Sequence, residues 1–289
     1  MIEVKYKEYI VAFLDVLGFK KIIQGENSEQ ETSRFFNNGR VLKEFMTNFR
    51  SGFDGIELIS DSIIAYRKLG CSALENDRMT QDFLRNICSI QFHLMDTNHP
   101  VRGGISVGAL YVNLEERIIT GPAFIDAFEL ECKNANVPRI VVNQKVIDLI
   151  SNEQEIVVAP EAHGVPSVRR DSSFIINFLN VFDLSDELTR PTNSVGTPPR
   201  ENANTFLRNI RRTIERGFQQ TEQNEKYSWL LAYCLWHIRR RIQTSTQRDF
   251  WQAQLLAFQG IIVPKRYLFR RGLDQIVRLK NSITGRSKF

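Results

Sequence analysis

Residues 9–22 read YIVAFLDVLGFKKI, and this stretch decides the fold expected for the N-terminal part of the chain. Tyr9 to Leu14 form a continuous apolar run, which is typical of a strand buried on both faces. Asp15 ends the run, just before a turn-prone Gly18 and a helix expected to begin near Phe19. An Asp in this position can simply cap the next helix. It can instead belong to a polar site if a second acid lies beside it.

A second acid is found in the segment ELISDSIIAY, residues 57–66. Its pattern predicts a hairpin with a tight turn at residues 60–62, which contains Asp61. If this hairpin lies beside the first strand, Asp15 and Asp61 meet at one edge of the sheet, where two carboxylates repel each other. A divalent cation removes the repulsion, and hard oxygen ligands suit Mg²⁺ or Mn²⁺.

The turn after Asp15 predicts a neighbouring site for phosphate. The backbone N–H groups of Leu17, Gly18 and Phe19 lie at the expected start of a helix, where unpaired donors favour anions. We therefore expect Asp15 to hold a metal ion and the turn to hold the phosphates to which the metal binds.

Beyond this site, the pattern predicts an α+β domain over residues 1–190. The expected order is β-α-α-β-β-α-β-α-β, giving a mainly antiparallel sheet of the ferredoxin-like kind with helices on one face. The segment TRPTNSVGTPPREN, residues 189–202, reads as a linker to a helical region, residues 191–289. In the first part we expect strands at 9–15, 101–112, 138–143 and 173–182, the hairpin, and helices beginning near 19 and spanning 31–49, 77–97, 121–135 and 143–150. In the second part we expect helices at 201–220, 226–242 and 246–259, and a basic helix ending near 281.

The charge is divided unevenly between these two parts. The chain of 289 residues has a net charge of +5, but residues 190–289 contain 19 Lys and Arg against 6 Asp and Glu. Residues 190–289 therefore have a charge of +13 and residues 1–189 have a charge of −8. Such asymmetry suggests different tasks for the two parts.

Composition excludes several classes of protein. With 42% hydrophobic and 25% charged residues, the chain is of the ordinary globular kind. It contains no apolar run of about 18 residues or more that would span a membrane, and its N-terminus lacks the layout of a signal peptide, so we expect a cytoplasmic protein. Neither the cysteines nor the histidines have metal-site spacing. They are Cys71, Cys88, Cys132, Cys234, His93, His99, His163 and His237.

Four motifs occur in an order that resembles class III nucleotide cyclases, most closely the pyrimidine cyclases of bacterial Pycsar antiphage systems. They are FLDVLGF (13–19), ISDS (59–62), RGGISVG (102–108) and GPAFIDAFELE followed by PRIVV (121–142). The resemblance covers roughly residues 7–182, and the order of the motifs is its specific part. It implies the cyclase α/β domain and the cyclisation of a nucleoside triphosphate to a 3′,5′-cyclic nucleotide, with release of pyrophosphate.

The same resemblance implies a site and partners. Two Mn²⁺ or Mg²⁺ ions would be held by Asp15 and Asp61, with the carbonyl of Val16 as a further ligand. Active sites would form between two antiparallel-docked copies of the chain. A separate effector protein that senses the cyclic nucleotide is implied, with phage infection as the trigger.

The chain departs from purine cyclases at two helix positions. Those enzymes have an Asn and an Arg, four residues apart, where this chain has Ile125 and Glu129. The negative charge of a phosphoryl transition state still needs compensation. Arg102 is the first candidate for this role and Arg139 and Lys20 are weaker ones. Arg102 can also be an ordinary ion-paired arginine of a strand.

The position that reads the base also departs. Adenylyl cyclases have Lys where this chain has Glu57, and their second base reader aligns with the apolar Ile118. A carboxylate can accept the N3–H of uracil or the N4 amine of cytosine. Arg50 could donate to a pyrimidine carbonyl, or it could be a solvated arginine at a helix end.

These features favour conversion of UTP to cyclic UMP, a second messenger in antiphage defence. Cyclic CMP is the close alternative. A second hypothesis is a catalytically degenerate cyclase fold that binds a nucleotide or a partner. A nucleic-acid-binding protein comes third, since the basic second part has no recognised DNA-binding motif.

Overall fold

The computed structural model describes residues 4–37, 52–151, 156–159, 173–180, 200–219, 224–245 and 247–261. The chain divides into two compact units, Met1–Ala159 with Ser173–Val181, and Pro160–Ser172 with Phe182–Phe289. The predicted boundary at residue 190 lies outside the described residues and stays a prediction.

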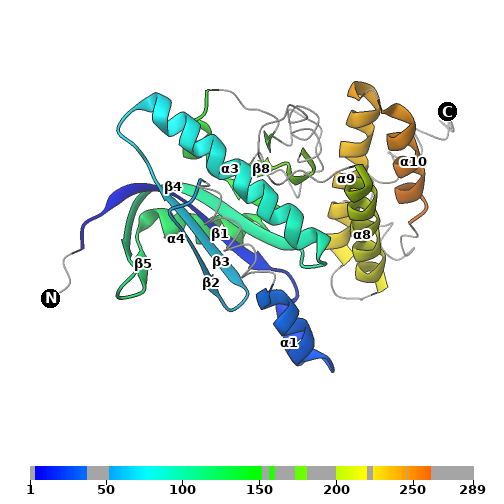
Figure 1. The fold of residues 1–289 in the computed structure, drawn as a ribbon, viewed down its shortest axis with the longest axis horizontal. Coiled ribbons are helices and arrows are strands. Elements are labelled where there is room, and N and C mark those ends of the chain that lie inside the picture. Colours follow the sequence, from blue (N-terminus) through cyan, green and yellow to red (C-terminus); the bar gives the residue numbers. More distant parts are fainter. Residues whose placement is uncertain are drawn as a thin grey trace. The chain divides into compact units, whose positions relative to one another are not determined.

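The first unit is built on a mixed sheet, of which Figure 1 labels β1, β2, β3, β4, β5 and β8. The strand order is β2-β3-β1-β4-β6-β8-β7, and β5 pairs with β4 off this path. All pairs are antiparallel except β4 with β6. The strands are β1 Lys7–Val16, β2 Gly55–Ile59, β3 Ser62–Lys68, β4 Val101–Asn113, β5 Ile118–Thr120, β6 Ile140–Val142, β7 Val157–Val158 and β8 Phe174–Ile176. The β2-β3-β1-β4 order and the helices between these strands confirm the ferredoxin-like α+β prediction.

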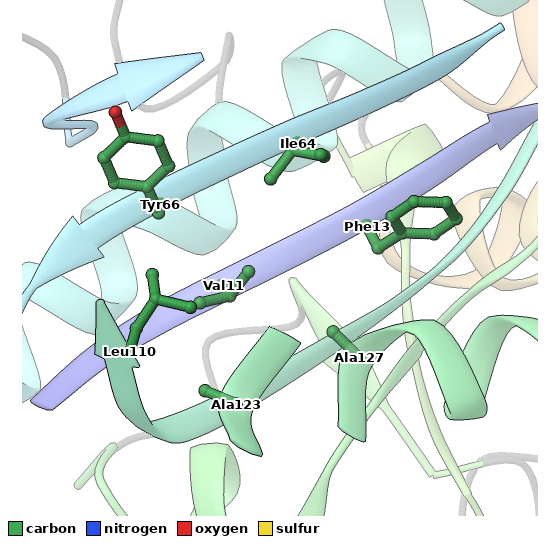
Figure 2. Packing of buried hydrophobic residues seen from close by; sticks show 7 residues of the cluster. All are labelled: Val11, Phe13, Ile64, Tyr66, Leu110, Ala123 and Ala127. Atoms are coloured by element: carbon green, nitrogen blue, oxygen red, sulfur yellow. The ribbon is translucent and has the colours of Figure 1, made fainter. Parts of the chain in front are cut away.

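Strand β1 lies inside the sheet, paired with β3 on one side and β4 on the other. Successive side chains of a strand point to opposite faces, so an apolar run without alternation fits a strand covered on both sides. On one face, Val11 and Phe13 pack with the cluster in Figure 2, which also contains Ala123 and Ala127 of α4 (Pro122–Asn134). Ile10, Ala12 and Leu14, which alternate with these residues, are fully buried.

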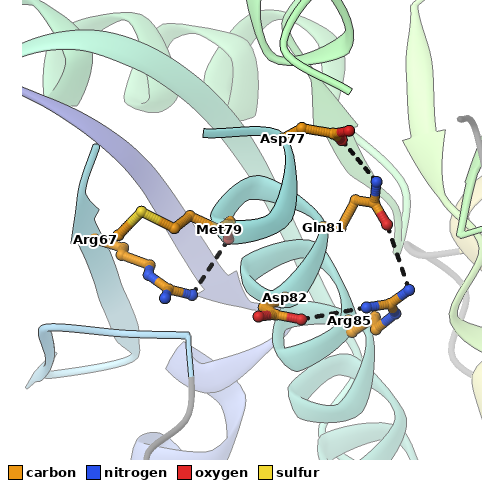
Figure 3. A network of polar contacts seen from close by, with 6 residues as sticks. All are labelled: Arg67, Asp77, Met79, Gln81, Asp82 and Arg85. Atoms are coloured by element: carbon orange, nitrogen blue, oxygen red, sulfur yellow. Dashed lines mark hydrogen bonds and ion pairs between the residues drawn. The ribbon is translucent and has the colours of Figure 1, made fainter. Parts of the chain in front are cut away.

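The other face of the sheet is covered by α3 (Ala73–Asp96). Arg67 of β3 pairs across the sheet with Ile10, on the face opposite Val11, and its guanidinium donates to the carbonyl of Met79 in α3 (Figure 3). The expectation of helices on one face is therefore wrong, because α3 and α4 lie on opposite faces of the sheet. The outer side of α3 has its own polar contacts, in which Arg85 bonds to Asp82 and Gln81.

Local signals explain most element boundaries. Helix α3 begins before the expected residue 77, because the Ser72 hydroxyl accepts the Glu75 amide and caps it. Helix α1 spans Phe19–Gln24 and α5 spans Gln144–Ile147. Residues 28–37 are helical, and the rest of the helix expected at 31–49 lies outside the described residues. The expected strand 173–182 is shorter, because a 3₁₀ turn at Phe178–Asn180 follows β8.

The second unit is helical where it is described, as predicted. Its helices are α8 Arg200–Gln219, α9 Asn224–Thr244 and α10 Arg248–Gln259, and α9 packs against both others. Its core includes Phe206, Trp229, Tyr233 and Trp251. The basic helix expected to end near residue 281 lies outside the described residues. No helix in the described part of the chain is both long and apolar enough to cross a membrane.

Candidate active site at the end of β1

The β2-β3 hairpin brings the second acid beside the first. Asp15 pairs with Ser62 in the β1-β3 register, and Asp61 lies in the turn directly before Ser62. The backbone amide of Val16 donates to the carbonyl of Asp61 at 3.1 Å, which ties the turn to the end of β1. Asp15, near the C-terminal end of β1, and Asp61, in the β2-β3 turn, are therefore neighbours at the edge formed by these strand ends, as the sequence predicted.

Arg102 joins them from the strand on the other side. It lies directly opposite Asp15 in the β1-β4 register, so both side chains emerge on the same face. Its Nε and Nη2 atoms each lie 3.0 Å from the Asp15 Oδ2 atom, and its side chain is 28% exposed. The structure thus brings the expected arginine to the expected acid, in an ion pair that water partly reaches.

Glu131 of α4 is a further acid at this site, and the sequence analysis did not identify it. Its Oε1 atom lies 2.6 Å from the Arg102 Nε, although this contact is not aligned as a hydrogen bond. The side chain is only 3% exposed, and its Oε2 atom accepts the thiol proton of Cys132 at 3.2 Å. Burial raises the pKa of Glu131, and the Cys132 thiol and Arg102 act in the opposite direction.

Glycine residues of β4 allow this contact. A Cβ atom on Gly104 would overlap the Ala127 carbonyl oxygen and lie 2.7 Å from the Leu130 Cβ, so α4 approaches the strand more closely than any side chain allows. Gly104 is two residues from Arg102 and therefore on the same face of β4. The small Gly104 side of the RGG sequence therefore lets α4, which carries Glu131, pack close to the backbone of β4 near Arg102. This glycine pair is the sequence signal that could have indicated the contact.

The turn after Asp15 has only part of the expected donor set. The Leu17 amide donates to the Pro100 carbonyl at 2.8 Å. The prediction that this amide is free to bind phosphate is therefore wrong. Gly18 has a φ of 82°, a left-handed conformation that favours glycine, and it precedes the first residue of α1, Phe19. The amides of Gly18 and Phe19 stay candidates for phosphate binding.

Glu57 lies on the same face of the sheet as Asp15. It pairs with Ile64, which pairs in turn with Phe13, and Phe13 and Asp15 are two residues apart on β1. Nearby on this face, the pKa of Tyr66 is raised to about 12, first by burial and then by the charge of Glu57. The predicted base reader and the predicted metal ligand Asp15 thus lie on one face of the sheet.

The remaining candidates separate into three groups. Arg139 is 1% exposed and donates to the Asn134 carbonyl at the end of α4, which is a structural role. Lys20 is exposed on α1, and Ile125 and Glu129 are exposed on α4. Arg50 lies outside the described residues.

Chemically, the site is a pair of carboxylates with one guanidinium, plus a buried third carboxylate. Asp15, Asp61 and the carbonyl of Val16 are hard oxygen donors, which fit Mg²⁺ or Mn²⁺ in type. Among the described residues, no three His, Cys, Asp or Glu side chains gather as a ready metal cluster. A cation here would need ligands from a substrate or from water as well, which is usual for Mg²⁺.

Comparison with known proteins gives structural likenesses only. No family model matches the chain, and no curated protein matches it. Among solved structures, the adenylyl cyclase CyaB from P. aeruginosa is 14% identical over 61% of this chain and 94% of its own, with a TM-score of 0.42. A class III adenylyl cyclase-like ATP-binding protein from Pseudomonas aeruginosa is 14% identical over 53% of this chain and 36% of its own, with a TM-score of 0.39.

An adenylate/guanylate cyclase/hydrolase from Silicibacter pomeroyi is 15% identical over 60% of this chain and 96% of its own, with a TM-score of 0.36. At such TM-scores these likenesses do not decide the fold or the activity. The fold rests on the strand order and helices described above.

Proposed function

We propose that this protein is a metal-dependent nucleotide cyclase that converts a pyrimidine nucleoside triphosphate, UTP in the first place, to its 3′,5′-cyclic nucleotide and pyrophosphate. One observation carries the proposal: Asp15 and Asp61 lie at one sheet edge with Arg102 bonded to Asp15. The order of the sequence motifs supports the same reading. A role of the product as a messenger in antiphage defence, sensed by a separate effector, rests on that resemblance alone.

The reaction is an internal displacement at phosphorus. The ribose 3′ oxygen forms a bond to the α-phosphorus and loses its proton, and the bond from this phosphorus to the oxygen that bridges to the β-phosphate breaks, so pyrophosphate leaves. Negative charge is spread over the phosphoryl oxygens during transfer, and catalysis depends on positioning and on cationic groups. Among the described residues, Arg102 is a cationic side chain bonded to Asp15 at this site.

The residues present fit divalent cations. Bound Mn²⁺ or Mg²⁺, two per site, would neutralise the triphosphate and lower the pKa of the attacking hydroxyl. Asp15, Asp61 and the carbonyl of Val16 would hold them. The amides of Gly18 and Phe19 would face the phosphate groups at the start of α1.

Base selection is assigned to Glu57, which lies on the face of the sheet shared by Asp15 and Arg102. Its carboxylate accepts the N3–H of uracil, and the N4 amine of cytosine is the alternative donor. A wrong base leaves a buried group unpaired, which costs roughly 1–3 kcal/mol and gives about tenfold or greater discrimination.

The test is incubation of the protein with UTP, CTP, ATP and GTP in the presence of Mn²⁺, followed by identification of the products. We expect cyclic UMP as the main product, and a weaker preference for UTP in Glu57→Gln. Cyclic AMP or cyclic GMP as the main product would rule out the pyrimidine proposal. A nucleotide-dependent rise of the melting temperature without any product would instead favour a degenerate, nucleotide-binding cyclase fold.

A further inference from the structure

The arrangement of Arg102 between two carboxylates raises a question about cation binding that the proposed function leaves open. Asp15 is bonded to Arg102 in this structure, and a cation at Asp15 would meet the guanidinium as a like charge. Arg102 therefore needs a second hydrogen-bond acceptor when the Asp15 carboxylate binds a cation. Glu131 is in place for this purpose, 2.6 Å from the Arg102 Nε and almost fully buried.

Burial of the ionised Glu131 carboxylate costs folding free energy, which suggests that this residue has a functional role. Removing a carboxylate from water costs several kcal/mol, and apolar replacements of buried ion pairs are often neutral or stabilising. Glu131 follows Ala123 and Ala127 on the inner face of α4, in helical steps of four residues where a small or apolar side chain would serve packing. Among the described residues, no donor forms an aligned hydrogen bond with its Oε1 atom, although the Arg102 Nε lies 2.6 Å away.

We propose that Glu131 is a positioning residue that holds Arg102 at α4, and thereby leaves the Asp15 carboxylate able to take a divalent cation. With Asp15 bound to the cation, the guanidinium pairs with Glu131 and stays at the edge of the site, where a phosphate group would come. Without Glu131, the guanidinium keeps Asp15 as its carboxylate partner and competes with the cation for it. This inference rests on the proposed function for the position of the cation. It adds that Glu131 of α4, in the same chain, positions Arg102.

The direct readout is the affinity of the nucleotide-free, full-length protein for Mn²⁺, measured from the electron paramagnetic resonance signal of free Mn²⁺. We expect Glu131→Gln to bind Mn²⁺ about tenfold more weakly, the size of one charge-assisted contact. Asp82→Asn is the control. It removes one carboxylate charge on α3, on the opposite face of the sheet, at a side chain that is 40% exposed and paired with Arg85, and its affinity for Mn²⁺ should equal that of the wild type.

A second pair of variants separates a hold on Arg102 from the effect of charge alone. In the Arg102→Gln background, adding Glu131→Gln should leave the Mn²⁺ affinity unchanged, because no guanidinium is present to be held. An equal loss of affinity with and without Arg102 would overturn the proposal, since Glu131 would then act only through its charge. Thermal unfolding of each variant shows that it is folded, and Glu131→Gln keeps the shape of the side chain.

Asp15→Asn distinguishes failure of this inference from failure of the proposed function. If Asp15→Asn loses Mn²⁺ binding while Glu131→Gln binds like the wild type, the role of Glu131 is wrong and the metal site stands. If the wild type binds no Mn²⁺, or if Asp15→Asn binds it normally, both the metal site and the inference are overturned.

Discussion

At the scale of single residues, the site depends on how three charged side chains divide their contacts. Arg102 bonds to Asp15 and also contacts Glu131, so the two acids share its guanidinium group. Loss of Asp15 would still leave Arg102 an ionic partner. The acids at the sheet edge are therefore available for function at a small cost in stability.

The first prediction concerns these acids. Asp15→Ala and Asp61→Ala should each abolish cyclisation, because loss of a ligand from the charged site removes several kcal/mol of transition-state stabilisation, at least about 10²-fold in rate. The melting temperature should change little, since Asp15 is at the sheet edge and 19% exposed. The measurement is product formation beside thermal unfolding. Asp82→Ala is the control, because Asp82 lies on α3, which covers the opposite face, and is paired there with Arg85. Turnover near wild type in either site variant would refute the assignment.

At the scale of elements, the contact of β4 with α4 sets the depth at which Glu131 meets Arg102. The second prediction is that Gly104→Ala destabilises the first unit by roughly 1–3 kcal/mol, as overpacking does. An added Cβ would overlap the Ala127 carbonyl oxygen and force the helix outward. Urea unfolding measures the effect. Gly260→Ala serves as control, because the nearest atom to its Cβ, the Ala257 carbonyl oxygen, would be at an ordinary 3.5 Å. Equal stability of Gly104→Ala and the wild type would mean that α4 does not depend on this close approach.

The third prediction concerns α9 of the second unit. His237 is 1% exposed, and among the described residues neither of its ring nitrogens has a hydrogen-bond partner. Burial, followed by Arg241 and Arg240, lowers its pKa from 6.5 to about 3. Above pH 6.5 both the folded and the unfolded chain hold a neutral ring, so pH has no effect through this group. Below pH 6.5 the ring of His237 is protonated in the unfolded chain but stays neutral in the folded chain. The free energy of unfolding therefore falls by about 1.4 kcal/mol per pH unit as the pH decreases, until the folded pKa is approached.

His237→Leu should remove this dependence. The measurement is the free energy of unfolding as a function of pH, compared between the variant and the wild type in the pH unit just below 6.5, before most carboxylates titrate. Identical slopes for the two proteins would show that His237 is protonated without cost in the folded state.

At the scale of the whole molecule, we predict that the proposed site is completed by a second copy of the chain. Ile125 and Phe128 of α4 are 54% and 44% exposed, although the Phe128 ring also packs edge-on against Phe13 of β1. Such exposure is unusual for large apolar side chains near a site. The fourth prediction is a head-to-tail homodimer in which the acids of one copy face α4 of the other. Phe128→Glu should give a monomer by light scattering and lose turnover, because a charge would be buried in the interface. Leu74→Glu, at an 81% exposed position of α3, should stay dimeric and active. A monomeric wild type that still turns over substrate would contradict the shared site.

How far the sequence could predict this molecule depends on the range of the interactions involved. The run from Tyr9 to Leu14 and the hairpin turn at Asp61 are local patterns, and both predict the observed strands. Arg102 was found through its motif, and the register places it at Asp15. The failures come from contacts between distant segments.

Two residues show this limit. The Leu17 amide looked free at a helix start, but Pro100 lies far along the chain and its carbonyl takes the bond. Glu131 looks like an ordinary helix acid in FELEC, and only the approach of α4 at Gly104 shows that it is buried against Arg102. The same holds for the faces of the sheet, since no local pattern decides that α3 and α4 take opposite sides.

The central claim is that Asp15 and Asp61 bind the cations that accompany a nucleoside triphosphate. The most direct measurement is a crystal structure of the protein with Mn²⁺ and a non-reactive UTP analogue, with manganese located by its anomalous scattering. We predict manganese bound by the carboxylates of both residues, with the analogue's phosphates at the Gly18 turn and Arg102 in contact with Glu131. Manganese located elsewhere, with Arg102 still bonded to Asp15 beside a bound analogue, would contradict the account.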